Sequence, residues 1–143
     1  VSNANFGTPQ RNVNGFDFKR LAMLLAVLEK RLGILMGTKD VFVNLVGGLK
    51  IDDPAADLAV ITAVASSARD KLLPKSVILI GEVGLGGEVR SVSRLDTRIN
   101  EAKSLGFKSV IAPTANVKRI KTQPKGIKIS GVANVGEAFH LLF

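Results

Sequence analysis

The residues of this chain that could carry out chemistry are serines, lysines and carboxylates, because the more reactive types are scarce. The 143 residues include no cysteine and one histidine, His140, near the apolar C-terminal end. This composition excludes disulfides and thiolate catalysis, and it disfavours a zinc site and a Ser-His-Asp triad. We predict that His140 is a half-buried packing residue. A Ser–Lys dyad stays open, and no metal site is predicted, since the carboxylates lack ligand spacing.

The segment 81–90, with the sequence GEVGLGGEVR, is the clearest glycine-rich motif. Its four glycines predict tight turns or a close approach of the backbone. The segment lacks the GxxxxGK(S/T) pattern of a phosphate-binding loop, and its glycine spacing differs from GxGxxG. We therefore predict no nucleotide site in this segment.

Positive charge is the strongest functional signal in the sequence. Lys and Arg number 20 against 12 acidic residues, and the net charge of +8 favours a polyanionic partner, nucleic acid above all. Arg90, Arg94 and Arg98 surround the glycine-rich segment and the helix predicted after it. A second group has no acid among its members and lies between Glu101 and Glu137: Lys103, Lys108, Lys118, Arg119, Lys121, Lys125 and Lys128.

Two interpretations of these groups are open, a surface that follows nucleic-acid phosphates and a solvated face without a partner. The segregation of positive from negative charge favours the phosphate-binding surface. Aromatic residues make up 5% of the chain, and all of them are phenylalanine. Because stacking onto unpaired bases usually needs exposed aromatic rings, contact with the backbone of a duplex is the better expectation.

Helix and strand patterns alternate along the chain and predict an α/β or α+β domain. Residues 1–15 are polar and rich in turn-forming types, as in a linker or an edge strand. The apolar spacing and the capping residues predict helices from about Asp17 to before Gly33, from Asp53 to about Arg69, from a Ser93/Asp96 capping box to Gly106, and after Asn134. Strands are predicted at 41–46, 49–51, 77–80, 108–112 and 126–130.

No apolar run reaches the ~18 residues of a membrane span, and no signal peptide is recognisable. Together with the missing cysteines, these features favour a reducing, cytoplasmic location without a membrane partner.

Several motifs, in order along nearly the whole chain, are similar to those of one protein family. They are FGTP at 6–9, LLAVLEKRLG at 24–33, DPAADLAV at 53–60, GEVGLGGEVR at 81–90, RINEA at 98–102 and LGFK at 105–108. On these motifs the chain resembles the C-terminal, Lon-protease-like domain of the RadA (Sms) family, bacterial proteins of DNA repair and recombination.

The resemblance implies a Lon proteolytic-domain-like fold (ribosomal protein S5 domain 2-like), an α/β (α+β) domain with a mixed sheet packed with helices. It implies that residues 1–15 are a linker or edge strand that enters from an upstream ATPase domain, and that residues 16–143 form the Lon-like domain. Full-length members are DNA-dependent ATPases with a four-cysteine zinc finger. ATP, Mg²⁺ and Zn²⁺ are therefore expected only in those upstream domains, and no cofactor is expected in this chain.

The same resemblance implies that this domain has no peptidase activity. Lon cleaves with a Ser–Lys dyad, and the matching positions here are Ala55, which has no hydroxyl, and Arg98, whose guanidinium stays protonated and cannot act as the base. Asp57 replaces a glycine of the Lon motif. The rival hypothesis is an active Ser–Lys peptidase with its nucleophile at Ser66, Ser67 or Ser91, and a serine-reactive probe distinguishes the two.

The resemblance further implies a hexamer scaffold that binds double-stranded DNA in recombinational repair and branch migration, with a recombinase and replication-fork proteins as further partners. The candidate DNA contacts form two surfaces. One consists of Arg90, Arg94 and Arg98, and the other of Lys118, Arg119 and Lys121. Arg98 has an alternative role in a structural ion pair with Asp57. A further alternative is an oligomerisation module that does not bind DNA.

Overall fold

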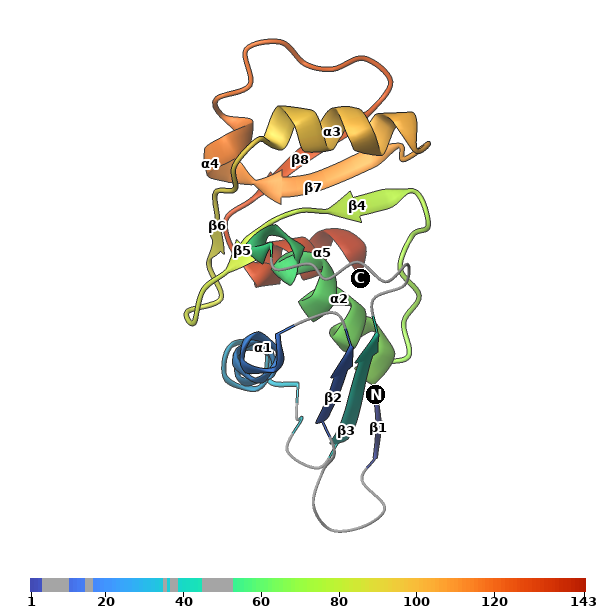
Figure 1. Ribbon diagram of the computed structural model, residues 1–143, viewed down its shortest axis with the longest axis vertical. Helices are drawn as coiled ribbons and strands as arrows, with labels where there is room; N and C mark the ends of the chain where they lie inside the picture. Colours follow the sequence, from blue (N-terminus) through green and yellow to red (C-terminus); the bar gives the residue numbers. More distant parts are fainter. Residues whose placement is uncertain (4–10, 15–16, 35, 37–38, 45–52) are drawn as a thin grey trace.

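Strands and helices alternate along the chain, as the sequence predicts for an α/β domain (Figure 1). The computed structural model describes residues 1–3, 11–14, 17–34, 36, 39–44 and 53–143. The strand predicted at 49–51 and the turn before it lie outside the described residues. Among the described residues, no helix combines the length and the apolar character that crossing a membrane requires.

The central sheet is parallel and has the order β4-β7-β8. Its strands are β4 (Val77–Leu79), β7 (Ser109–Pro113) and β8 (Lys128–Val132). A short antiparallel hairpin follows β4 and pairs β5 (Glu82–Val83) with β6 (Val89–Arg90). Near the N-terminus, β3 (Lys39–Asn44) lies between β1 (Ser2–Asn3), which is antiparallel to it, and β2 (Arg11–Asn14), which is parallel.

Most helices begin and end close to the predicted positions: α1 (Phe18–Leu32), α3 (Leu95–Ser104) and α5 (Val135–Leu142). The helix predicted from Asp53 consists of the 3-10 turn η1 (Pro54–Ala56) and α2 (Asp57–Ala68), and α4 (Thr114–Val117) was not predicted. The Asp17 carboxylate accepts a hydrogen bond from Lys19 N at 2.8 Å, and Gly33 ends α1 with φ +67°. These local signals were readable because a cap lies within one turn of the helix that it stabilises.

The capping box predicted at Ser93 and Asp96 is wrong. Helix α3 begins one residue later than the box requires, and Arg94 occupies the N-cap position with φ +56° and no hydrogen bond from its side chain to the helix. The left-handed turn at Arg94 redirects the chain, and the Ser93 carbonyl instead accepts a hydrogen bond from Arg98 Nε at 3.0 Å.

Two hydrophobic cores lie on the two faces of the central sheet. Side chains alternate along β7, so that Ile111 joins the first core and Val110 joins the second. The first core holds α1, α2 and α5 against the sheet and includes Leu24, Leu28, Ile61, Val64, Val132 and Phe139. The second core holds α3 and includes Leu95, Ile99, Ala102, Ala112 and Ile127. We call these the α2 side and the α3 side of the sheet; Figure 1 shows α3 and α2 on opposite sides of it.

Candidate functional site

The two positions that the resemblance assigns to a dyad lie next to each other in the structure, and Asp53 links them. Asp53 Oδ1 accepts a hydrogen bond from Ala55 N at 3.0 Å, and Asp53 Oδ2 lies 2.5 Å from Arg98 Nη2. Ala55 is buried in the second core. The place therefore holds a methyl group and a paired guanidinium, which provide neither a nucleophile nor a base.

The Asp53 carboxyl has a pKa below its ordinary value. Desolvation raises this pKa, but the hydrogen bond from Ala55 N and the hydrogen bond and charge of Arg98 together outweigh the desolvation. Both side chains of the pair are partly exposed, 28% for Arg98 and 40% for Asp53. The alternative in which Arg98 forms an ion pair is therefore confirmed, but the partner is Asp53 and not the expected Asp57.

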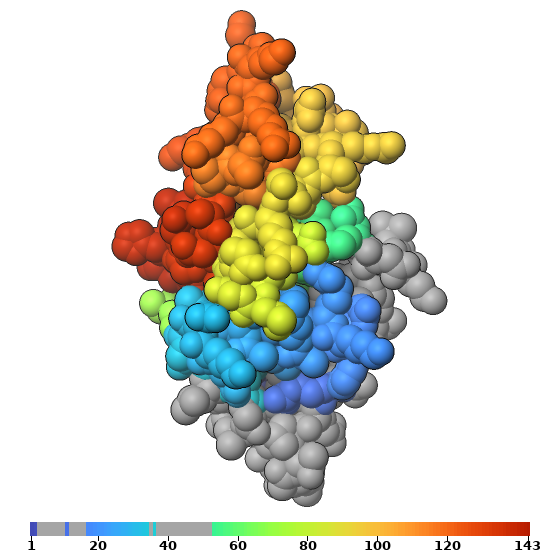
Figure 2. All heavy atoms as spheres, turned by 90° about the vertical axis from the view of Figure 1, so that its left-hand side faces the viewer, coloured from blue at the N-terminus to red at the C-terminus, as the bar shows by residue number. Residues whose placement is uncertain are grey.

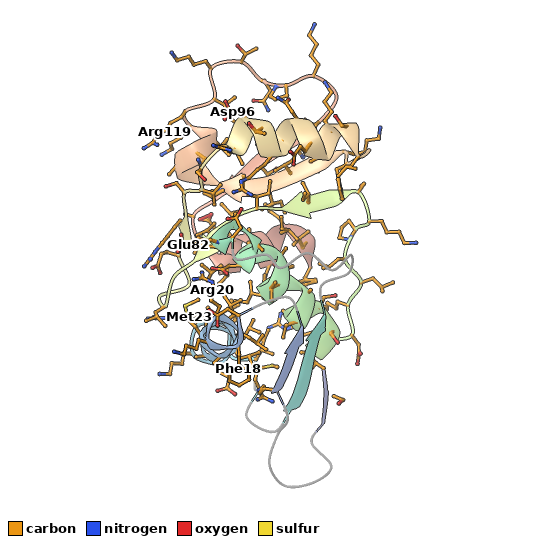
Figure 3. The ribbon with its side chains drawn as sticks, in the orientation of Figure 1. Phe18, Arg20, Met23, Glu82, Asp96 and Arg119 are labelled. Atoms are coloured by element: carbon orange, nitrogen blue, oxygen red, sulfur yellow. The ribbon has the colours of Figure 1, made fainter. Side chains whose placement is uncertain are left out.

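The expected partner, Asp57, pairs with Arg20 instead, so that part of the prediction is wrong. Asp57 is the first residue of α2, has no exposed surface, and faces α1 on the α2 side of the sheet. Arg20 Nε donates to Asp57 Oδ1 at 2.9 Å, Arg20 Nη2 contacts Oδ2, and Val83 N donates to Oδ2 at 3.1 Å. Glu82 lies 3.9 Å from the same guanidinium (Figure 3).

This cluster was missed at the level of the sequence. The hydrogen bond to Asp57 raises the pKa of Arg20, so the guanidinium stays charged. A signal was present, since Asp57 directly precedes the apolar run Leu58–Ile61, and a carboxylate on a buried helix needs a cation. The sequence did not show which cation, because Arg20 is 37 residues away.

The serines of the rival hypothesis have no lysine ammonium as a hydrogen-bond partner among the described residues. The Ser66 hydroxyl donates to the Lys71 carbonyl, Ser67 Oγ accepts a hydrogen bond from the Val1 amino group at 3.1 Å, and Ser91 is exposed. Within the described ranges, no serine hydroxyl is hydrogen-bonded to a lysine ammonium, and no three metal-ligating side chains gather. His140 is exposed rather than half-buried, because it lies on the outer face of α5 while Phe139 points into the first core.

Among the basic residues, Arg90 is held by the hairpin. Its guanidinium lies 2.8 Å from Glu88 Oε1. The Glu88 carboxylate also accepts a hydrogen bond from its own backbone N–H, and this bond, followed by the one from Arg90, lowers the Glu88 pKa. The pair neutralises Arg90 in part. By contrast, Arg94, Lys118, Arg119 and Lys121 are exposed and have no ionic partner among the described residues.

The structure joins residues from the two predicted surfaces in one cleft of about 570 Å³. Arg94 reaches it from the start of α3, and Arg119 and Lys121 reach it from the segment after α4. We call this the basic cleft. Its floor is apolar and includes Leu95, Ile99 and Ile120, and Asp96 is the acid on its wall. Figure 3 shows Asp96 on α3 and Arg119 at the end of α4, above the central sheet.

The basic cleft lies in the part of the chain that holds the entire net charge. Residues 90–128 contain ten of the 20 Lys and Arg side chains and two of the 12 acidic ones, so this segment has a charge of +8 and the rest of the chain is balanced. We call it the basic region. In Figure 2 its gold and orange atoms occupy one end of the molecule, beyond the hairpin and α1. Such segregation concentrates an electrostatic potential suited to a polyanion.

Comparisons with known proteins identify relatives of this fold. Residues 34–141 match the family model of the Lon protease (S16) C-terminal proteolytic domain. The chain is 49% identical over 138 residues to the DNA repair protein RadA of Bacillus subtilis, with 96% of this chain and 30% of the relative covered. It is 46% identical to the DNA repair proteins RadA of Chlamydia pneumoniae and Aquifex aeolicus, over 99% and 98% of this chain. It spans 32% and 31% of their lengths.

Proposed function

The chain belongs to the family of Lon protease (S16) C-terminal proteolytic domains, and from this premise we propose that it is a Lon-like domain without peptidase activity that serves DNA repair in a RadA-type protein. Its role there is to bind double-stranded DNA and to act as a scaffold for a hexamer. ATP hydrolysis, with its Mg²⁺, and zinc binding belong to other parts of such a protein, which works in the cytoplasm together with a recombinase and replication-fork proteins.

The loss of peptidase activity is supported by the chemistry of the two dyad positions. Ala55 has no group that can attack a carbonyl, and its side chain lies in the second core. Arg98 is occupied by Asp53 and by the Ser93 carbonyl. A guanidinium stays protonated, so it does not accept a proton from a serine. These two contacts also hold it in place, away from the serines elsewhere in the chain.

DNA binding is supported above all by the gathering, at the basic cleft, of cations that have no ionic partner among the residues that the structure describes. Arg94, Arg119 and Lys121 belong to a region that carries the whole net charge, and Lys118 is exposed beside them. An unpaired surface cation can exchange its counterions for a DNA phosphate without first breaking an ion pair. Arg90 and Arg98 are paired within the chain, so they contribute less than the others.

The scaffold role is supported by apolar surface on α1. Phe18 is 55% exposed, and a groove of about 260 Å³ runs along this helix, lined by Phe18, Ala22 and Ala26 above the buried Leu21 and Leu25. Exposed apolar grooves of this kind commonly mark contacts between proteins.

The test of DNA binding is fluorescence anisotropy of a labelled duplex, titrated with this chain over a salt series. The slope of log K against log salt is about −0.9 per phosphate contacted. The double variant Arg119→Glu/Lys121→Glu should lower duplex affinity by about tenfold or more, because each reversal removes a charge-assisted contact, and it should make the slope shallower. The matched control, Lys71→Glu/Lys75→Glu, reverses two exposed cations outside the basic region and should have little effect.

Equal losses in both double variants would show a response to net charge alone and contradict the assignment of the basic region. No binding at low salt, with a hexamer by light scattering, would leave the oligomerisation module without DNA binding. Circular dichroism of each variant confirms that the fold is retained.

A further inference from the structure

We propose that the basic cleft is a binding site for a nucleoside 5′-phosphate. Two sources supply this chemistry, a free nucleotide and the unpaired 5′-phosphorylated end of a DNA strand. The second source rests on the proposed function, which brings DNA to this face of the molecule, and the first does not.

The phosphate is recognised by the cations at the rim of the cleft. Arg94, Arg119 and Lys121 all line it, and none has an ionic partner among the described residues. Three like charges around one cavity repel one another, and an anion between them removes that repulsion. Guanidinium groups also bind phosphate oxygens with two parallel hydrogen bonds, which gives the phosphate a defined orientation.

The nucleoside is recognised by the remainder of the lining. Ile120 and Pro124 are half-buried and leave apolar surface open to the cleft, above the buried side chains of Leu95 and Ile99. An apolar floor suits the face of a base and has no use in binding an inorganic anion. Asn100 supplies both a donor and an acceptor within the cleft.

Asp96 adds an acceptor to the lining. Its carboxylate accepts a hydrogen bond from a sugar hydroxyl or from a base N–H, and it repels a phosphate placed beside it. A nucleoside phosphate therefore satisfies both Asp96 and the cations Arg94, Arg119 and Lys121, whereas an inorganic anion satisfies the cations alone. The nearby amide of Asn116 takes no part, since it is engaged with the backbone N–H and carbonyl of Val92 at 2.8 Å and 2.9 Å.

The size of the cleft also favours one nucleotide. Its volume of about 570 Å³ lies within the range of small-molecule sites, ~300–1,000 Å³. A stacked duplex presents only phosphates to such a cleft and leaves the apolar floor and Asp96 without partners. An unpaired nucleotide uses all three parts of the lining.

The experiment is isothermal titration calorimetry of this chain with ADP, without added magnesium, and with inorganic pyrophosphate as the comparison ligand. We expect one ADP per chain, bound about tenfold or more tightly than pyrophosphate, because only ADP uses the apolar floor. Arg119→Ala should weaken both ligands about tenfold through the loss of a charge-assisted hydrogen bond. Ile120→Ala should weaken ADP and leave pyrophosphate unchanged. The control Lys108→Ala removes an exposed charge of the basic region that does not line the cleft.

Equal affinity for ADP and pyrophosphate, or an Arg119→Ala variant that binds ADP like the unchanged protein, would overturn the proposal. The two sources of the ligand are distinguished by fluorescence anisotropy with a duplex that carries a 5′ overhang, measured with and without its terminal phosphate. A gain from the phosphate that is lost in Arg119→Ala assigns the DNA end, and ADP binding without such a gain assigns the free nucleotide. If salt-dependent duplex binding persists while ADP fails to bind, this proposal falls and the proposed function stands.

Discussion

The charged side chains on the two sides of the central sheet differ in burial and in pairing. On the α2 side, Asp57 is completely buried, and Arg20 and the Val83 N–H satisfy it. On the α3 side, Arg94, Arg119 and Lys121 line an open cleft and have no ionic partner within the described part of the chain. A buried charge must be paired within the fold, whereas an exposed one is free to meet an external ligand. The comparison separates charges that hold the structure together from charges that are available for binding.

The Arg98–Asp53 pair lies between these extremes. It links the N-cap of η1, which precedes α2, with α3, and both members are partly exposed. It therefore resembles the α2 side in being paired and the α3 side in being solvated. Its behaviour on mutation shows whether Arg98 belongs with the charges that hold the structure together or with those that are available for binding.

The largest expected effect tests whether the two sides fold as one unit. Ile61 lies in the first core and Ile99 in the second, and both are essentially inaccessible to solvent. Ile61→Ala and Ile99→Ala should each lower the free energy of unfolding by about 4 kcal/mol, through lost burial and the cavity left behind. Because one sheet carries both cores, urea unfolding should stay a single transition with an unchanged m value. A biphasic curve for either variant would show that the sides unfold separately.

The next effect contrasts the buried ion pair with the exposed one. Arg20→Met leaves the buried Asp57 without its cation, and we expect a loss of about 3 kcal/mol in the free energy of unfolding. Duplex affinity, measured on the folded variant by anisotropy, should stay within about twofold, since Arg20 lies far from Asp96 and Arg119 of the basic cleft (Figure 3). A stability loss below about 1 kcal/mol would contradict the assignment of Arg20 as the cation that Asp57 requires.

The smallest effect comes from Arg98→Ala. Because the pair with Asp53 is partly exposed, we expect a loss of about 1 kcal/mol or less in stability. The folded-state pKa of Asp53 is lowered, so the stabilisation from this pair is present above the ordinary aspartate pKa of ~3.9 and is lost as the pH falls through the folded value. The difference in melting temperature between the unchanged protein and Arg98→Ala should therefore be smaller at pH 3 than at pH 7.

Duplex affinity of the same variant provides the check. If Arg98 is structural, affinity stays within about twofold while the melting temperature falls. A large loss of affinity with an unchanged melting temperature would instead move Arg98 to the class of binding residues, together with Arg119.

Local features of the fold were predictable from the sequence. Asp17 and Gly33 bound α1, and Asp53, Pro54 and Asn134 mark helix starts as predicted, because each of these signals acts within one turn of the chain. The prediction of a capping box at Ser93 is wrong although its residue types match the local pattern. The left-handed backbone of Arg94 sets the first residue of α3 instead.

The net charge of +8, its concentration in residues 90–128, the lack of a hydroxyl at Ala55 and the alternation of helices and strands follow from the amino-acid sequence alone. Which charges are neutralised depends on the three-dimensional fold. The fold pairs Asp57 with Arg20 rather than with Arg98, and it brings Arg94 to the same cleft as Arg119. The difference arises because the energy of a charge depends on its burial and on its distance in space to other charges. Spacing along the chain sets neither of these.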